Sequence, residues 1–173
     1  MLIPTSETSE MLVFDRVMVD IGDDQSIDND LSTYSSFLVN MKDMLAKADS
    51  RTLVLIDEFG SGTEPAAGGA IAEAILSELD SRGAYGVITT HYTNLKLYAS
   101  GETGVVNGAM MFDVKNIAPM FKLEMGLPGN SFAFELARKM GLPEQIIKDA
   151  EARAGEEFVG IERNLRKIAR NRK

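Results

Sequence analysis

The sequence predicts an α/β fold in which helices flank a mostly parallel sheet. Residues 52–56 and 85–90 form two runs of apolar and β-branched residues, and a segment with a helical pattern separates them. Strand, helix and strand in this order are typical of a parallel crossover unit. Residues 104–125 return to short strand-like runs, which predicts an antiparallel addition at an edge of the sheet. With 173 residues, 45% of them hydrophobic, the chain is long enough for one domain with its own core.

The first expected strand and helix lie in the N-terminal part of the chain. Residues 12–14 and 17–19 are two short extended pieces that form either a hairpin or one continuous strand. Residues 22–30 are polar and predict a loop. Ser32 or Thr33 can then cap a helix. The apolar face of that helix is predicted to comprise Tyr34, Phe37, Leu38, Met41, Leu45 and Ala48.

The crossover helix has clear start and stop signals. Pro65 suits the first position of a helix, and Gly83 suits the position just past its end, so the helix is expected to run to about Arg82. The two apolar runs on either side are expected to be strands buried on both faces.

Acidic and imidazole side chains follow these two strands directly. Asp57 and Glu58 end the first apolar run, and His91, the single histidine of the chain, lies just past the second. Ligands of parallel α/β sheets bind beyond the carboxyl ends of the strands. We therefore expect Asp57, Glu58 and His91 at one edge of the sheet.

The C-terminal part combines short strands with helices. Strands are predicted at residues 104–107, 109–113 and 120–124, followed by a short helix from about residue 131 to 140. A long helix is expected from residue 143 to the end, with apolar residues at alternating three- and four-residue spacings that resemble the start of a coiled coil. The predicted division is a domain at 1–142 and a helical extension at 143–173.

Composition excludes several classes of protein. The net charge of −8 makes the chain a poor partner for nucleic acid by itself, because affinity for a duplex comes largely from cations that meet phosphates. No cysteine is present, so a disulfide framework and a thiolate metal site are both excluded. No basic leader segment or long apolar run suggests secretion or membrane spanning. A cytoplasmic protein fits these observations.

Asp57 and Glu58 carry the strongest chemical signal. A strand end can hold the first carboxylate where it orients a magnesium ion, and the second can then act as general base on a water. The alternative is an acidic turn with no catalytic role, since acidic turns are common. A nuclease would need a further cluster of metal ligands, which the sequence does not suggest.

Two further features support a phosphate site, and each also has a structural alternative. His91 at a strand end can donate to or position a terminal phosphate, although a lone histidine is more often structural. Ser32 and Thr33 at a helix start can be simple caps, but free N–H groups there also suit a phosphate.

Three segments together resemble the MutS family. Residues 31–37, 53–65 and 89–92 match, in order and spacing, the ABC signature segment, the Walker B strand with its D-loop, and the switch histidine of that family. Residues 20–27, 60–65 and 128–134 look most like the MutS-II branch, which is implicated in recombination control and ribosome rescue. The resemblance implies an incomplete P-loop NTPase sheet of the ABC type, with ATP and magnesium as cofactors.

The resemblance also implies roles for individual residues. Asp57 would help to organise magnesium, Glu58 would activate water, and His91 would sense the γ-phosphate. The remaining nucleotide contacts would come from the signature segment, the D-loop and a coupling loop, at Ser32, Thr33, Gly62 and Gln25. Ser32 would reach the nucleotide bound to a partner subunit, which implies a homodimer.

One departure from the family pattern has large consequences. The glycine-rich phosphate loop, Walker A, occurs nowhere in the sequence. We therefore expect residues 1–142 to be the C-terminal part of a MutS-type ATPase domain, inactive alone, within a longer protein that meets DNA or the ribosome through other domains. The alternatives are a non-catalytic dimerisation or interaction module and a part of another ABC-type ATPase.

Overall fold

The computed structural model describes residues 5–21, 33–101, 103–113, 116–129 and 132–155. The chain divides into two compact units, Met1–His91 and Tyr92–Lys173. The expected helical extension from residue 143 falls within the second unit, and its status as a separate domain stays a prediction. No helix among the described residues is long and apolar enough to cross a membrane.

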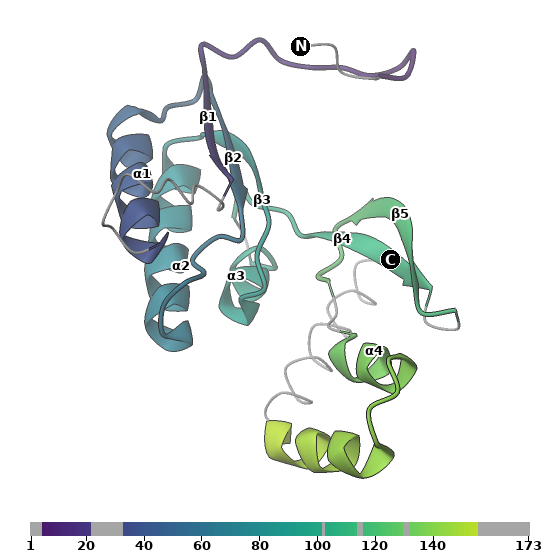
Figure 1. Ribbon diagram of the computed structural model, residues 1–173. Coiled ribbons are helices and arrows are strands. Elements are labelled where there is room, and N and C mark those ends of the chain that lie inside the picture. The colour runs from purple at the N-terminus through teal and green to yellow at the C-terminus, as the bar shows by residue number, and fades with distance from the viewer. Residues whose placement is uncertain (1–4, 22–32, 102, 114–115, 130–131, 156–173) are drawn as a thin grey trace. The chain divides into compact units, whose positions relative to one another are not determined.

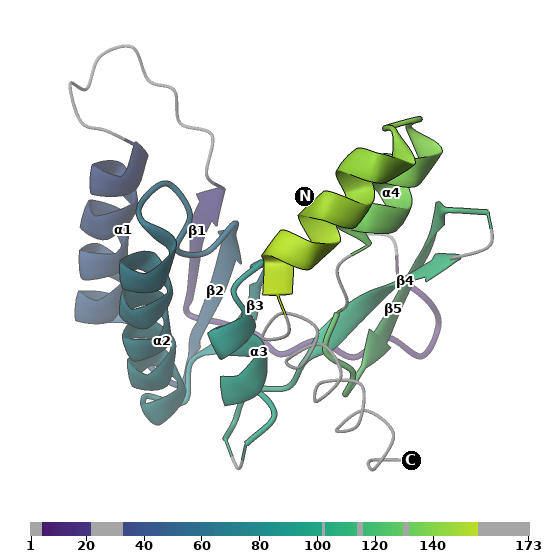
Figure 2. The same cartoon turned by 90° about the horizontal axis from the view of Figure 1, so that it is seen from below.

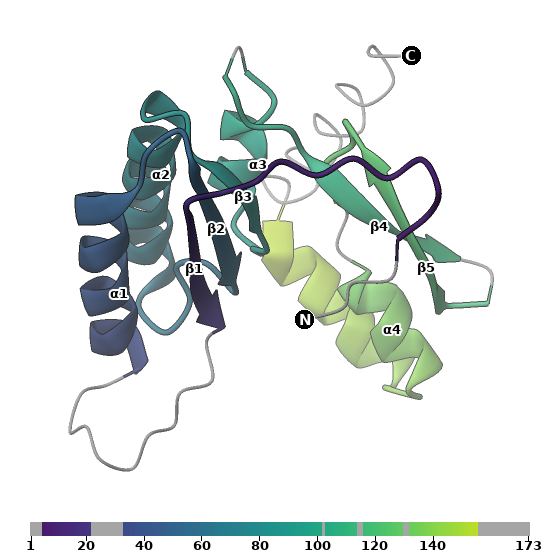
Figure 3. The same cartoon turned by 90° about the horizontal axis from the view of Figure 1, so that it is seen from above.

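The first unit is a parallel three-stranded sheet with two helices on one face (Figure 1). Its strands are β1 (Arg16–Ile21), β2 (Thr52–Asp57) and β3 (Tyr85–Ile88), in the order β1-β2-β3. The helices α1 (Thr33–Lys47) and α2 (Pro65–Ser81) connect them as two crossovers. Figure 3 shows both helices on the same side of the strands. The predicted α/β class and the parallel crossover are confirmed.

The core of this unit lies between the sheet and the two helices. On β2, Thr52, Val54 and Ile56 are buried, whereas Leu53 and Leu55, which point to the other face, are half-buried. Side chains that α1 and α2 bury are Met41, Met44, Ala72, Ile75, Leu76 and Leu79. The prediction that both apolar runs are buried on two faces is wrong, because both helices cover the same face. Val87 on β3 is accordingly 64% exposed.

Helix α2 has the ends that its sequence predicts. Pro65 occupies the start of the helix, and the Glu64 carboxylate accepts hydrogen bonds from the N–H groups of Ala66 (3.0 Å) and Ala67 (2.8 Å). These two bonds lower the pKa of Glu64 below its usual value, because they favour the charged form. Gly83 follows the helix with a positive φ of 68°, as expected for a helix end.

Helix α1 and strand β1 differ in detail from the expectation. Residues 12–14 lie outside the strands, so β1 is one continuous strand from Arg16. Leu38, predicted on the buried face of α1, is exposed, and Met44 is 3% exposed although the pattern omitted it. A helix buries those residues that its actual neighbours cover, which periodicity locates only to within one position.

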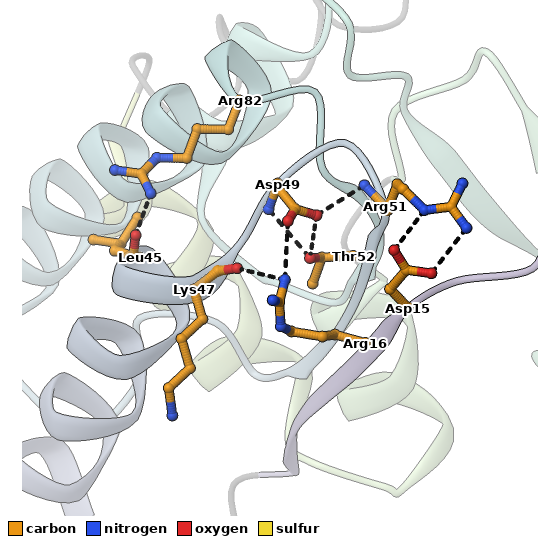
Figure 4. Close-up of polar contacts among 8 residues, drawn as sticks. All are labelled: Asp15, Arg16, Leu45, Lys47, Asp49, Arg51, Thr52 and Arg82. Atoms are coloured by element: carbon orange, nitrogen blue, oxygen red, sulfur yellow. Dashed lines mark hydrogen bonds and ion pairs between the residues drawn. The ribbon is translucent and has the colours of Figure 1, made fainter.

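A network of ion pairs and hydrogen bonds joins the amino ends of β1 and β2 (Figure 4). Arg51 binds Asp15 through two hydrogen bonds, Nε to Oδ2 at 2.6 Å and Nη2 to Oδ1 at 2.8 Å. Asp49 accepts the Arg51 N–H and the buried Thr52 hydroxyl, both at 2.9 Å, and its other oxygen pairs with Arg16 at 2.9 Å. The turn between α1 and β2 is therefore tied to the start of β1.

The second unit contains a β-hairpin and short helices. Its elements are α3 (Thr93–Tyr98), β4 (Gly108–Asp113), β5 (Ala118–Met125), α4 (Ala133–Lys139) and a further helix over residues 144–155. Strands β4 and β5 pair antiparallel with each other and form a sheet of their own. The predicted addition of these strands to the parallel sheet is therefore wrong, and residues 104–107 are not a strand.

The helices that follow the hairpin are held by one arginine. Arg138 at the end of α4 pairs with Glu144 at 3.4 Å and with Glu151 at 2.6 Å on the next helix. Ile147, on the same helix as these two carboxylates, is 2% exposed. The predicted helix start near residue 143 is confirmed, while the rest of the predicted long helix lies outside the described residues.

Candidate functional site

The candidate site lies at the carboxyl end of β2. Asp57 is the last residue of this strand and is exposed, as is Glu58, which follows it. Strand β3 runs parallel to β2, with Ile88 paired to Ile56, so both strands end at the same edge of the sheet. The two carboxylates therefore lie beside the segment that leaves β3, Thr89–His91.

Thr89 connects the ends of the two strands. Its hydroxyl donates a hydrogen bond to Oδ1 of Asp57, and the backbone N–H of Glu58 donates to the same hydroxyl oxygen at 2.9 Å. The backbone of Thr89 adds two bonds of 2.9 Å, from its N–H to the carbonyl of Ile56 and from the N–H of Phe59 to its carbonyl. Side chain and backbone of one threonine thus hold the strand end and the turn after it.

The turn after β2 has an unusual backbone conformation. Glu58 has a positive φ of 50°, a region that costs a non-glycine residue energy unless its surroundings enforce it. The bonds from Thr89 to the amides of Glu58 and Phe59 are such surroundings. Non-glycine residues in strained conformations cluster at active sites, ligand clamps and switch regions, where the strain is part of the mechanism.

Aromatic packing ties this turn to the start of α1. Phe59 is 1% exposed, and its ring meets Phe37 edge-on with centroids 5.7 Å apart. Phe37 in turn stacks on Tyr34 at 5.8 Å. Gly62, whose φ is 90°, lies so close that a Cβ added to it would be 3.7 Å from the backbone nitrogen of Tyr34. The turn after β2 and the first turn of α1 are therefore neighbours.

The described residues bring together part of the predicted site. Asp57 and Glu58 lie at one edge, Gly62 lies against the first turn of α1, which begins at Thr33, and His91 is exposed at the carboxyl side of β3. Ser32 and Gln25 lie outside the described residues. Roles of these seven residues toward a nucleotide stay predictions. Among the residues that the structure describes, no group of three or more potential metal ligands of the His, Cys, Asp and Glu types is found.

No role for Thr89 was predicted from the sequence, although it begins the segment 89–92 that resembles a family motif. Its hydroxyl group directly follows the apolar residues of β3. Its partners Asp57 and Glu58 are about thirty residues away in the chain, and only the parallel register of β2 and β3 brings them within reach.

Fold and site together define an α/β protein whose candidate ligand site lies at the carboxyl ends of parallel strands. The family model described as MutS domain V matches residues 1–157, and the chain belongs to the MutS family.

Several relatives share the name Endonuclease MutS2. The chain is 45% identical to the protein of Geobacillus kaustophilus over 173 residues, which are 100% of the chain and 22% of the relative. Identity to the protein of Brevibacillus brevis is 46% over 171 residues, 99% of the chain and 22% of the relative. For Halalkalibacterium halodurans it is 46% over 160 residues, 92% of the chain and 20% of the relative. The chain spans about a fifth of the length of these relatives.

Proposed function

We propose that this chain is the C-terminal part of the ATPase domain of a MutS-type protein of the MutS-II branch. It would supply the signature segment, the Walker B strand, the D-loop and the switch histidine to a composite site for ATP hydrolysis. Membership of the MutS family and the likeness to proteins named MutS2 support the proposal. The observation that carries it is the exposed pair Asp57 and Glu58 at the carboxyl end of β2.

The residues at this edge fit a magnesium–nucleotide complex. Carboxylate oxygens are the ligands that magnesium prefers, and Asp57 ends a strand whose hydrogen bonds fix its backbone. When bound, magnesium neutralises charge on the phosphates. Asp57 would orient the ion, and Glu58, one residue further, would take a proton from the attacking water.

The remaining predicted residues would contact nucleotide from other directions. His91 would position the γ-phosphate from the end of β3, and Gln25 would belong to a loop that couples nucleotide to neighbouring domains. Helix α1 begins at Thr33. Ser32 and Thr33 would direct the N-terminal end of this helix at the nucleotide of the partner subunit. The contact of Gly62 with the first turn of α1 supports a common surface for the D-loop and the signature segment.

Hydrolysis would require residues that this sequence does not contain. No glycine-rich phosphate loop occurs in the 173 residues. We therefore expect the chain to be inactive alone and to work within a homodimer of a longer protein. With a net charge of −8, binding to DNA or to the ribosome would fall to other domains of that cytoplasmic protein.

The test of this function is ATP hydrolysis by the longest natural form of the protein, which on this proposal includes a phosphate loop. Glu58→Gln should lower kcat by roughly 100-fold or more, because it removes a general base, while ATP binding measured by calorimetry persists. Glu78→Gln is the matched control, since Glu78 pairs with Arg82 on the exposed side of α2.

Two results would contradict the proposal. If the protein binds no ATP, or if Glu58→Gln and Glu78→Gln hydrolyse ATP at the same rate, the acidic pair is not a hydrolytic site. The chain would then be better explained as a non-catalytic dimerisation module.

A further inference from the structure

The Thr89 hydroxyl touches both residues that the proposed function makes essential. It donates to Oδ1 of Asp57 and accepts the backbone N–H of Glu58 at 2.9 Å. We propose that Thr89 is a positioning residue, which sets the rotation of the Asp57 carboxylate toward the metal ion and the backbone conformation of Glu58. This inference rests on the proposed function and concerns the same site.

The direction of the two hydrogen bonds is fixed by chemistry. A backbone N–H can only donate, so the Thr89 oxygen is the acceptor in its bond to Glu58. A hydroxyl has one hydrogen, and an ionised carboxylate can only accept, so that hydrogen points at Asp57. With Oδ1 held by Thr89, Oδ2 of Asp57 would be the oxygen left to bind a cation.

The hydroxyl can position its partners because Thr89 itself is fixed. Its N–H donates to the carbonyl of Ile56 and its carbonyl accepts the N–H of Phe59, both at 2.9 Å. A β-branched side chain also has few rotamers open to it. The oxygen therefore has a defined place relative to the end of β2, and the left-handed backbone of Glu58 is held from that place.

The chain offers a pair of variants that separates the hydroxyl from the shape of the side chain. Thr89→Val keeps the branched shape and removes the hydroxyl, whereas Thr89→Ser keeps the hydroxyl and removes only a methyl group. If Thr89 served only to pack the fold, both variants would lose function, or Thr89→Ser, which lacks the methyl group, would lose more of it. A positioning role requires that Ser preserves function and Val does not.

The experiment compares both variants with the unchanged protein in its longest natural form. Thr89→Val should lower kcat and raise the half-saturating concentration of Mg²⁺ or Mn²⁺ by roughly 10- to 100-fold, as is usual when a partner of a metal ligand is lost. KM for ATP at saturating metal should change little. Thr89→Ser should restore both values to within about threefold.

A second readout does not depend on activity. The amide of Glu58 loses its acceptor in Thr89→Val, so hydrogen–deuterium exchange of the peptide that spans residues 57–60 should quicken by roughly fivefold or more. In Thr89→Ser the exchange should match the unchanged protein. If the two variants differ in melting temperature, exchange of a peptide from α2 serves as the reference. Faster exchange that is confined to residues 57–60 is then a local effect.

The outcomes distinguish this inference from the proposed function. If Glu58→Gln abolishes hydrolysis but Thr89→Val leaves kcat, metal dependence and exchange unchanged, the positioning role is overturned and the ATPase stands. Equal damage by Val and Ser would also overturn it. If Glu58→Gln has no effect on hydrolysis, the proposed function itself fails, and only the exchange result then bears on Thr89.

Discussion

Asp49 shows how one side chain at the end of a helix organises the start of two strands. Its pKa is lowered first by the Arg51 N–H, then by the Thr52 hydroxyl and by Arg16. The pKa of Asp15 is lowered too, chiefly by its hydrogen bonds with Arg51. Because these bonds favour the charged carboxylates, the folded state binds protons less readily than the unfolded chain does.

Stability should therefore fall in acid. The contribution of Asp15 and Asp49 is present above their ordinary pKa of 3.8 and is lost as the pH drops through their lower folded values. We expect urea midpoints to decline from about pH 4 downward and to vary less with pH in Asp49→Asn. A variant whose midpoint declines as steeply as that of the unchanged protein would contradict this role for Asp49.

Single residues of the site were predictable only where a reactive side chain directly follows an expected strand in the sequence. Asp57 and Glu58 stand out because an acidic pair directly follows an apolar run. Thr89 does not, because its importance comes from partners that the register of two parallel strands supplies. The left-handed backbone of Glu58 has no sequence signal either, since this conformation usually selects glycine or asparagine.

At the level of elements, the sequence predicted the ends of helix α2 correctly. It did not predict correctly how many faces of each strand are buried. Pro65 and Gly83 locate the ends of α2 because the start and stop of a helix depend on neighbouring residues alone. An apolar run predicts a strand but not how many of its faces are covered. Because α1 and α2 lie on the same face, β3 is more exposed than its sequence suggests (Figure 2).

The pairing of β2 with β3 depends on a glycine. A Cβ on Gly86 would lie 2.5 Å from Cγ2 and 2.8 Å from the carbonyl oxygen of Val54, its neighbour on β2. Gly86→Ala should therefore force the strands apart and cost roughly 1–3 kcal/mol of the free energy of unfolding. Urea unfolding measures this cost. Gly129→Ala is the control, because a Cβ there meets nothing within 4 Å; equal midpoints for both variants would contradict the expected clash.

At the level of the whole molecule, the chain forms two units where the sequence suggested one core. The parallel sheet belongs to one unit and the β4–β5 hairpin to the other. Alternating strand patterns predict that strands exist, but which strands share a sheet is decided by contacts distant in sequence. The parallel pairing of β2 and β3 was thus predictable from their crossover, whereas the separate sheet of β4 and β5 was not.

One face of the parallel sheet carries apolar side chains away from the helices. The register places Val17 beside Leu53, and Val19 and Val87 on either side of Leu55, all on the face opposite to the buried Val54 and Ile56. Val17 is 59% and Val87 is 64% exposed. A continuous apolar face of this kind is an aggregation liability in a protein on its own.

We therefore expect the isolated chain to self-associate through this face. Replacing Val17 and Val87 together with threonine keeps the preference for strand and should raise the apparent dissociation constant roughly tenfold or more, because less apolar surface is removed from water. Light scattering across a concentration series measures the effect. Val39→Thr is the control, since Val39 is 56% exposed but lies on α1. If light scattering shows a monomer at every concentration, the predicted self-association through this face is wrong.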